Sequence, residues 1–288
     1  MSHSPGLLRI EQICLDEFGC FIRRHRRYLV TFLAIYFYSL FSWRRLRLLR
    51  AGHCLFQHID DVLDGDRLVD MPALAYVDKL LGEIDSGHYD LALPISALAC
   101  YVFTEADARL HEGLDIRAGL LGLIKTLRFD RLRLDGQMRL AEAVLREHHH
   151  QTFVYSMDVS LMMVDSTLRA VDVPEMVGAL AWVSPMRDLP DDLQRGLINI
   201  PLEVLEQAQR EGAQSLDYTA LIATPAVQNW MRREFRLGQQ NLRGVPKRLR
   251  KLWKKRGALE ILAFFLEIRR YAGWYARKHR AILEDEIS

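Results

Sequence analysis

The stretch that decides the fold class is residues 259–282, which read LEILAFFLEIRRYAGWYARKHRAI. Its apolar residues recur at intervals of three and four, which is the spacing of one face of an α-helix. Residues 144–164, VLREHHHQTFVYSMDVSLMMV, show similar spacing and are rich in residues that favour helices. No segment shows a convincing strand-like alternation of polar and apolar residues. The sequence therefore predicts an all-α fold.

Glycine and proline residues divide the rest of the chain into segments of ordinary helix length. They fall, among other places, at Gly65, Gly136, Pro174, Gly196 and Pro225. Because these residues end or interrupt helices, the pattern predicts about ten helices. The sequence has no internal repeat and no low-complexity or linker-like tract. We therefore expect residues 1–288 to form a single helical domain.

The composition is that of a folded protein kept in a reducing compartment. Of the 288 residues, 50% are hydrophobic and 26% are charged, which excludes a disordered or collagen-like chain. The four cysteines have neither the spacing of a zinc site nor the density of a secreted disulfide scaffold: Cys14, Cys20, Cys54 and Cys100. We therefore expect buried thiols and a cytoplasmic location.

Three aspartates follow an apolar stretch in residues 58–66, HIDDVLDGD, and form the first acidic cluster: Asp60, Asp61 and Asp64. Asp60 and Asp64 are four residues apart, so on a helix they share one face. Gly65 predicts the end of that helix, where the macrodipole also disfavours negative charge. A bound cation would offset both penalties, and carboxylates are suitable ligands for Mg²⁺. A solvated acidic helix end is the alternative interpretation.

A second acidic cluster lies in residues 184–193, SPMRDLPDDL. Its members are the side chains Ser184, Arg187, Asp188 and Asp192. The hydroxyl and the two carboxylates are spaced i, i+4 and i+8, which again predicts one helical face. Two prolines weaken this prediction, because Pro185 is expected near a helix start and Pro190 is expected to kink or break the helix.

Two acidic helix faces of this kind suit a site that holds several Mg²⁺ ions against a diphosphate group. Diphosphate leaves readily only when its charge is neutralised, which metal ions and Arg or Lys donors do. Its departure from an allylic substrate leaves a carbocation, which needs a dry cavity lined by apolar and aromatic side chains. We therefore expect a helical bundle with a central apolar cavity.

These two motifs resemble those of the squalene/phytoene synthase family. The matching stretches are residues 60–64, DDVLD, and residues 186–203, MRDLPDDLQRGLINIPLE. The second stretch is similar to the family signature of Arg-Asp, Glu-Asp, Gly-Arg and Leu-Pro, and the resemblance extends over residues 23–282. It implies an isoprenoid synthase fold and a Mg²⁺-dependent prenyltransferase. Such an enzyme joins two farnesyl or two geranylgeranyl diphosphates head to head.

The resemblance also implies roles for individual residues. The ligands of Mg²⁺ or Mn²⁺ would be Asp60, Asp64, Ser184, Asp188 and Asp192. The catalytic residues would be the four aspartates of that set and Tyr155. Contacts with the substrate would come from Gln57, Asp61, Asp130, Phe153 and Arg187. A requirement for NADPH is left open.

The chain departs from the family pattern at several positions. The family's Ala-Gly pair falls on Ser156 and Met157, and a further glycine falls on Ser160. Losing these residues removes room for a prenyl chain that passes close to the helix backbone. Gln57 replaces an arginine, and Ser184 replaces an asparagine. Two alternatives follow: a terpene cyclase or prenyltransferase with another acceptor, and a non-catalytic, membrane-associated assembly factor on the same fold.

Two segments raise the question of a membrane. Residues 28–43, YLVTFLAIYFYSLFSW, are shorter than the roughly 20 apolar residues of a spanning helix. We expect a buried core helix there, with a membrane-surface contact or a true span as the alternatives.

Residues 231–280 carry 16 Lys or Arg against 3 Glu, which predicts an anionic partner. The run 247–256 within them suits the inner face of an anionic bilayer, with Leu249, Leu252 and Trp253 inserted. A solvated basic face is the alternative. No nucleic-acid-binding module accompanies the charge, so nucleic acid is not an expected partner.

Overall fold

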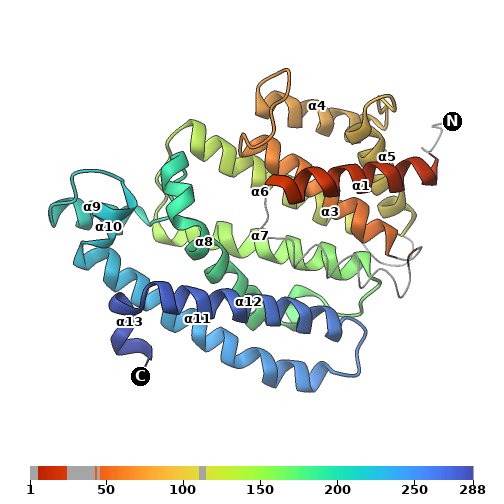
Figure 1. Ribbon diagram of the computed structural model, residues 1–288. Helices are drawn as coiled ribbons and strands as arrows, with labels where there is room; N and C mark the ends of the chain where they lie inside the picture. Colours follow the sequence, from red (N-terminus) through yellow and green to blue (C-terminus); the bar gives the residue numbers. More distant parts are fainter. Residues whose placement is uncertain (1–5, 25–42, 44–45, 110–114, 288) are drawn as a thin grey trace. The chain divides into compact units, whose positions relative to one another are not determined.

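A computed structural model describes residues 6–24, 43, 46–109 and 115–287, most of which are helical (Figure 1). This part of the chain contains twelve α-helices, one short 3₁₀ helix (Ala170–Asp172) and no strand. The predicted all-α fold is confirmed. The number of α-helices is close to the ten or so that the sequence pattern predicted.

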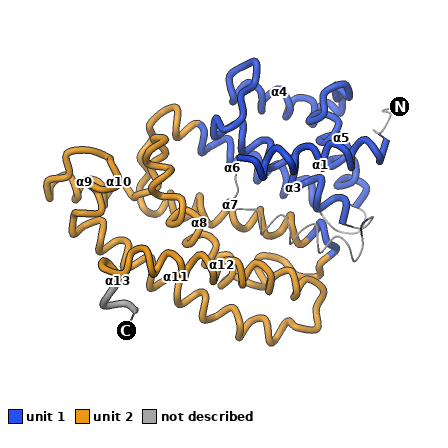
Figure 2. The backbone as a smooth tube through the Cα atoms, in the orientation of Figure 1, with its two compact units in different colours: residues 1–131, 162–165 blue, residues 132–161, 166–288 orange. Residues whose placement is uncertain are grey.

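The helices group into two compact units, which Figure 2 colours separately. Unit 1 comprises residues 1–131 and 162–165, and unit 2 comprises residues 132–161 and 166–288. The boundaries fall within helices α6 (Ile116–Asp135) and α7 (Glu142–Met163) and just after α7. The expectation of a single domain over residues 1–288 stays a prediction.

Unit 1 is built from α1 (Leu7–Arg24), α3 (Arg47–Leu63), α4 (Ala73–Ser86), α5 (Pro94–Ala108) and the first part of α6. Twelve residues of α3 and ten of α5 are buried. A helix that is apolar on most of its faces is stable only inside a core. Helices α3 and α5 pack against each other and form that core.

Buried charge ties α1 to α3. The guanidinium groups of Arg47 and Arg50 both donate to the Glu11 carboxylate, at 2.7 Å and 2.9 Å. The Arg50 side chain has no exposed surface and also donates to the backbone carbonyl of Trp43 at 3.0 Å. Removing one partner of a buried ion pair typically costs about 3–5 kcal/mol. The pair therefore holds the first turn of α3 against α1.

Unit 2 contains most of α7, followed by α8 (Pro174–Arg195), α9 (Leu202–Arg210), α10 (Tyr218–Ile222), α11 (Pro225–Leu252), α12 (Ala258–Lys278) and α13 (Arg280–Ile287). Its core lies where α8, α11 and α12 pack together. Helices α8 and α11 approach closely at Gly238, where an added Cβ would lie 2.0 Å from the Trp182 indole. Trp182 fills the space that Gly238 leaves and packs edge-on against Phe235 and Tyr275.

Helix α8 continues through both of its internal prolines, Pro185 and Pro190. The prediction that Pro185 lies near a helix start is wrong, and the helix does not break at Pro190. Each proline removes one backbone hydrogen bond. However, Met186 and Leu189 between them are buried in the core of unit 2. Packing of this face offsets the lost hydrogen bonds, so one helix carries the whole second acidic cluster.

The described residues give no indication of the central apolar cavity that the sequence suggested. Among the described residues, unit 1 has a pocket of about 10 Å³ and unit 2 has a pocket of about 30 Å³. A cavity needs roughly 10–15 Å³ by this measure to hold one water molecule. The pocket of unit 1 is therefore at the limit for one water molecule, and the pocket of unit 2 has room for about two or three.

Within the described part of the chain, no helix has the length and apolar character required to cross a membrane. The apolar segment 28–43 lies outside the described residues except for Trp43. In the basic run, Leu249 is buried in the core of unit 2 and Leu252 packs against that core. The prediction that these two leucines insert into a bilayer is wrong, because their side chains already pack inside unit 2. Trp253 is 54% exposed.

Candidate functional site

The first acidic cluster lies at the C-terminal end of α3, in unit 1. The backbone N–H of Asp64 donates to the carbonyl of Asp60 at 2.8 Å, which closes the last turn. Gly65 follows with φ of +78°, a left-handed conformation that glycine adopts without strain. Asp60 is half-buried and Asp64 is exposed. The prediction that these aspartates lie at the C-terminal end of a helix is therefore confirmed.

Asp61 points into unit 1 instead of sharing the exposure of Asp64. Its side chain is 6% exposed and forms an ion pair with Arg24 at the end of α1. Its backbone carbonyl accepts a hydrogen bond from the N–H of Arg67 at 2.8 Å. The resemblance implies that Asp61 contacts the substrate, and its observed contacts stabilise the packing of α1 and the turn after α3.

A buried polar network lies beside this helix end. Arg67 and His58 donate to the Glu17 carboxylate of α1, and the Nε2 of His58 lies 2.9 Å from the Tyr76 hydroxyl. Burial alone would raise the pKa of Glu17, but the hydrogen bonds from His58 and Arg67 outweigh it and lower the pKa to about 2. Burial lowers the pKa of His58 despite the opposing effect of Glu17. The network therefore keeps the Glu17 carboxylate ionised at neutral pH next to α3.

Gln57 and Asp130 complete the predicted residues of unit 1. Gln57 lines the pocket of about 10 Å³, together with side chains of the buried polar network. Asp130 is half-buried on α6. Its neighbour Arg131 donates to the backbone carbonyl of Leu63 at 2.9 Å, which ties α6 to the last turn of α3. The structure thus places the helix of Asp130 against the end that carries the first acidic cluster.

The second acidic cluster occupies one face of α8, in unit 2. The guanidinium of Arg187 donates two hydrogen bonds to the carboxylate of Asp188, from Nε at 2.9 Å and from Nη2 at 2.5 Å. The same Nη2 lies 3.3 Å from the Ser184 hydroxyl. The Arg187 guanidinium also lies 4.7 Å from the centre of the Tyr271 ring of α12. The cluster is therefore organised around one guanidinium group.

Asp192 has a partner of its own. The side-chain amide of Asn199 donates to Asp192 at 2.8 Å, and the amide oxygen accepts from Arg133 at 2.9 Å. Arg133 is 1% exposed and also donates to the backbone carbonyl of Ile198 at 2.7 Å. This chain of hydrogen bonds fixes the orientation of the Asp192 carboxylate.

Sequence reasoning missed two residues that touch the second acidic cluster. Asn199 lies inside the stretch that resembles the family signature, but the pattern gives no sign that its amide reaches Asp192. Tyr271 has no motif around it, and only the packing of α12 on α8 brings its ring to Arg187. Spacing along one helix cannot reveal a partner that comes from another element.

The predicted residues of α7 lie outside the two acidic clusters, near the core of unit 2. Phe153 is half-buried and packs against the core of unit 2, and Tyr155 is half-buried. Met157 is 1% exposed and belongs to that core. The hydroxyl of Ser156 donates to the backbone carbonyl of Thr152 at 2.8 Å, so it is satisfied within its own helix. The departures from the family pattern therefore add core packing and local hydrogen bonds to α7.

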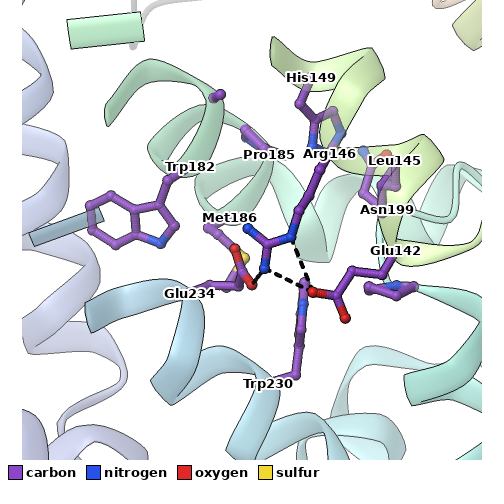
Figure 3. Close-up of a pocket in the computed structure, with 12 residues that line it drawn as sticks. Glu142, Leu145, Arg146, His149, Trp182, Pro185, Met186, Asn199, Trp230 and Glu234 are labelled. Atoms are coloured by element: carbon purple, nitrogen blue, oxygen red, sulfur yellow. Dashed lines mark hydrogen bonds and ion pairs between the residues drawn. The ribbon is translucent and has the colours of Figure 1, made fainter. Parts of the chain in front are cut away.

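A further pocket in unit 2 combines charged and aromatic side chains (Figure 3). Arg146 bridges Glu142, at 2.9 Å, and Glu234. Trp182 and Trp230 also line this pocket, whose volume is about 30 Å³. Burial raises the pKa of Glu234, with the charges of Arg146 and Arg233 opposing it. None of the residues predicted as ligands lines it.

The donor atoms of each cluster suit Mg²⁺, but the ligand set is incomplete in each unit by itself. Among the described residues, no group of three His, Cys, Asp or Glu side chains is close enough to hold one metal ion. Proteins commonly bind Mg²⁺ through one or two carboxylates together with substrate phosphates and water. Asp60 with Asp64, and Asp188 with Asp192, are pairs of that kind. Each pair therefore suits a Mg²⁺ ion whose remaining ligands are phosphate oxygens or water.

No protein-family model matches the chain, and no curated protein and no solved structure is detectably similar to it. The chemistry of the two clusters is therefore the basis for assigning a function.

Proposed function

We propose that the protein is a Mg²⁺-dependent prenyltransferase of the squalene/phytoene synthase type. It ionises an allylic prenyl diphosphate, farnesyl or geranylgeranyl, and joins the carbocation head to head with a second prenyl diphosphate. The observation that carries the proposal is the second acidic cluster. Ser184, Asp188 and Asp192 lie on one helix face together with a guanidinium group suited to diphosphate.

Each acidic cluster supplies its own set of candidate ligands. Asp60 and Asp64 of unit 1, and Ser184, Asp188 and Asp192 of unit 2, would hold Mg²⁺ or Mn²⁺. When bound, the cation supplies neutralisation of the diphosphate charge, which makes diphosphate a better leaving group. Hard oxygen donors of this type do not select a soft metal.

Arg187 is the residue that links ligand binding to the carboxylates. In the ligand-free protein both oxygens of Asp188 are occupied by Arg187. A diphosphate offers the same planar guanidinium a second bidentate partner. If Arg187 turns to the diphosphate, the Asp188 oxygens become available as ligands. Asn199 meanwhile keeps Asp192 oriented, since its amide is anchored by the buried Arg133.

The differences between α7 and the family pattern bear mainly on which acceptor the enzyme uses. Met157 fills a core position where the family has glycine. A bulkier α7 favours the runner-up, a terpene cyclase or a prenyltransferase with a different acceptor. Mass spectrometry of the hydrocarbon product separates the two. A product with twice the carbon number of the donor supports head-to-head coupling and rejects the runner-up.

The cell compartment follows from the cysteines. The four side chains are free thiols, and Cys14, Cys54 and Cys100 are buried. Free buried thiols are typical of a reducing compartment. We therefore assign the activity to the cytoplasm, where prenyl diphosphate substrates would be met in solution or at a membrane surface.

Release of diphosphate tests the proposal. The purified full chain is incubated with Mg²⁺ and farnesyl or geranylgeranyl diphosphate, and free diphosphate is measured over time. We expect release that depends on Mg²⁺ and falls at least a hundredfold in Arg187→Gln. The control Arg210→Gln changes an exposed arginine at the end of α9 and should retain the parent rate. Absence of release with both substrates would reject the proposed reaction.

A further inference from the structure

Helix α12 presents an apolar stripe to solvent. Leu259, Ala263, Leu266 and Trp274 are spaced i, i+4, i+7 and i+15, so they lie along one side of the helix. Leu259 is 60% exposed, Leu266 is 55% exposed and Trp274 is 39% exposed. Arg270 lies between them at i+11. We name this stripe, from Leu259 to Trp274, the α12 face.

The α12 face cannot be buried in the core of unit 2 by a rotation of the helix. The opposite side of the helix is already packed inside, through the buried residues Ile261, Phe265, Ile268, Ala272 and Tyr275. A rotation that buried Leu259 and Leu266 would expose these five residues. The helix is therefore held with its second apolar stripe facing solvent. Exposed apolar surface is unfavourable in water, and a patch of it is typical of an interaction site.

The surroundings of the α12 face are strongly basic. Residues 251–280 contain nine Lys or Arg and two acidic residues, an excess of seven positive charges. The exposed basic side chains lie just before the stripe, on it and after it: Lys251, Lys254, Lys255, Arg256, Arg269, Arg270, Arg277, Lys278 and Arg280. The Nζ of Lys278 lies 4.9 Å from the centre of the Trp274 ring. Trp253, 54% exposed, precedes the helix.

We propose that the α12 face docks unit 2 on an anionic lipid bilayer. Leu259 and Leu266 would enter the boundary between headgroups and acyl chains, and Trp253 and Trp274 would sit at headgroup level. The surrounding Lys and Arg side chains would contact anionic headgroups. The proposal does not depend on the enzymatic activity, since none of these residues belongs to either acidic cluster.

Charge distinguishes this occupant from a second copy of the chain. A symmetric contact through the α12 face would bring Arg269, Arg270 and Arg277 against the same residues of the other copy, and like charges at an interface oppose association. A bilayer containing anionic lipid supplies both the apolar depth for the leucines and the negative surface for the basic residues.

Vesicle sedimentation of the full chain tests the docking. Vesicles of phosphatidylcholine alone are compared with vesicles of phosphatidylcholine and anionic phosphatidylglycerol, whose negative surface attracts basic segments. We expect binding to the anionic vesicles only, weakened by added salt. The double variant Leu259→Asp with Leu266→Asp should bind at least tenfold more weakly. The control Leu8→Asp changes an exposed leucine of unit 1 and should bind like the parent.

Folding and charge are checked separately. Circular dichroism establishes that each variant is helical, and Arg269→Gln with Arg277→Gln provides a second variant that leaves the leucines in place. This second variant should also bind anionic vesicles several-fold more weakly. The proposal is overturned if the parent does not sediment with anionic vesicles or if both double variants bind like the parent. It is also overturned if the α12 face instead supports a dimer in solution that the leucine variant abolishes.

Discussion

At the scale of single residues, the second acidic cluster shows how a guanidinium group can organise carboxylates before any ligand is present. Arg187 contacts Asp188, Ser184 and the ring of Tyr271 at once. These contacts limit the repulsion between the carboxylates on α8. They also mean that neutralising Asp188 removes an attraction as well as a repulsion, so the stability of the ligand-free protein is a poor measure of metal binding.

Replacing Asn199 by alanine tests whether the orientation of Asp192 matters. The change leaves a donor of the buried Arg133 without its partner, which is expected to cost about 1–3 kcal/mol. It also frees the Asp192 carboxylate to rotate. We expect the Mg²⁺ concentration for half-maximal diphosphate release to rise several-fold, while the rate at saturating Mg²⁺ changes less. An unchanged Mg²⁺ dependence with lowered stability would indicate a purely structural Asn199.

His279 predicts a pH dependence of stability. The imidazole is 6% exposed, and its burial and the charge of Lys278 lower its pKa from the ordinary 6.5 to about 4. Between pH 6.5 and 4 the unfolded imidazole binds a proton that the folded one does not, so acid favours unfolding. The slope from this group is at most about 1.4 kcal/mol for each pH unit. Denaturant unfolding of His279→Gln should show a smaller loss of stability over this window than His88→Gln, which changes an exposed histidine.

At the scale of elements, the sequence could predict faces of helices but not what they pack against. The spacing of Asp60 and Asp64 and the glycine after them correctly place an acidic helix end, because both signals are local. The reading of Pro185 as a helix start failed because tertiary packing of Met186 and Leu189 outweighs the local preference. The membrane orientation of Leu249 failed for the same reason. The partners Asn199 and Tyr271 depend on contacts between elements, which spacing along the chain does not encode.

Two glycines in helices test the account of how α8 and α11 pack. At Gly238 an added Cβ would lie 2.0 Å from Cδ2 of Trp182, so Gly238→Ala should force the indole or the helix to move. Overpacking of a core typically costs about 1–3 kcal/mol. At Gly82, inside α4, no atom lies within 4 Å of the added Cβ.

Gly82→Ala should therefore stabilise the protein by about 0.5–1 kcal/mol, through the lower conformational entropy of the unfolded chain. Chemical denaturation of both variants measures the two changes in unfolding free energy. Equal effects of the same sign would contradict the close packing of Trp182 on Gly238.

At the scale of the whole molecule, each compact unit carries one acidic cluster on one of its helices. The proposed reaction needs both clusters, since neither carboxylate pair alone provides the several Mg²⁺ ions that a departing diphosphate requires. The sequence resemblance implies a metal-binding role for the carboxylates of each cluster. We therefore compare one variant of unit 1 with one variant of unit 2, each in the full chain.

Thermal melting of five proteins, with and without Mg²⁺ plus diphosphate, tests this central claim most directly. They are the parent, Asp60→Asn of unit 1 and Asp188→Asn of unit 2, with the exposed acids Asp85→Asn and Glu206→Gln as controls in the two units. A ligand at 100 times its dissociation constant stabilises by about 2.7 kcal/mol. We predict that the parent and both controls gain this stabilisation and that each cluster variant loses most of it. The metal-site assignment is contradicted if Asp60→Asn and Asp188→Asn gain as much from the ligands as the parent does.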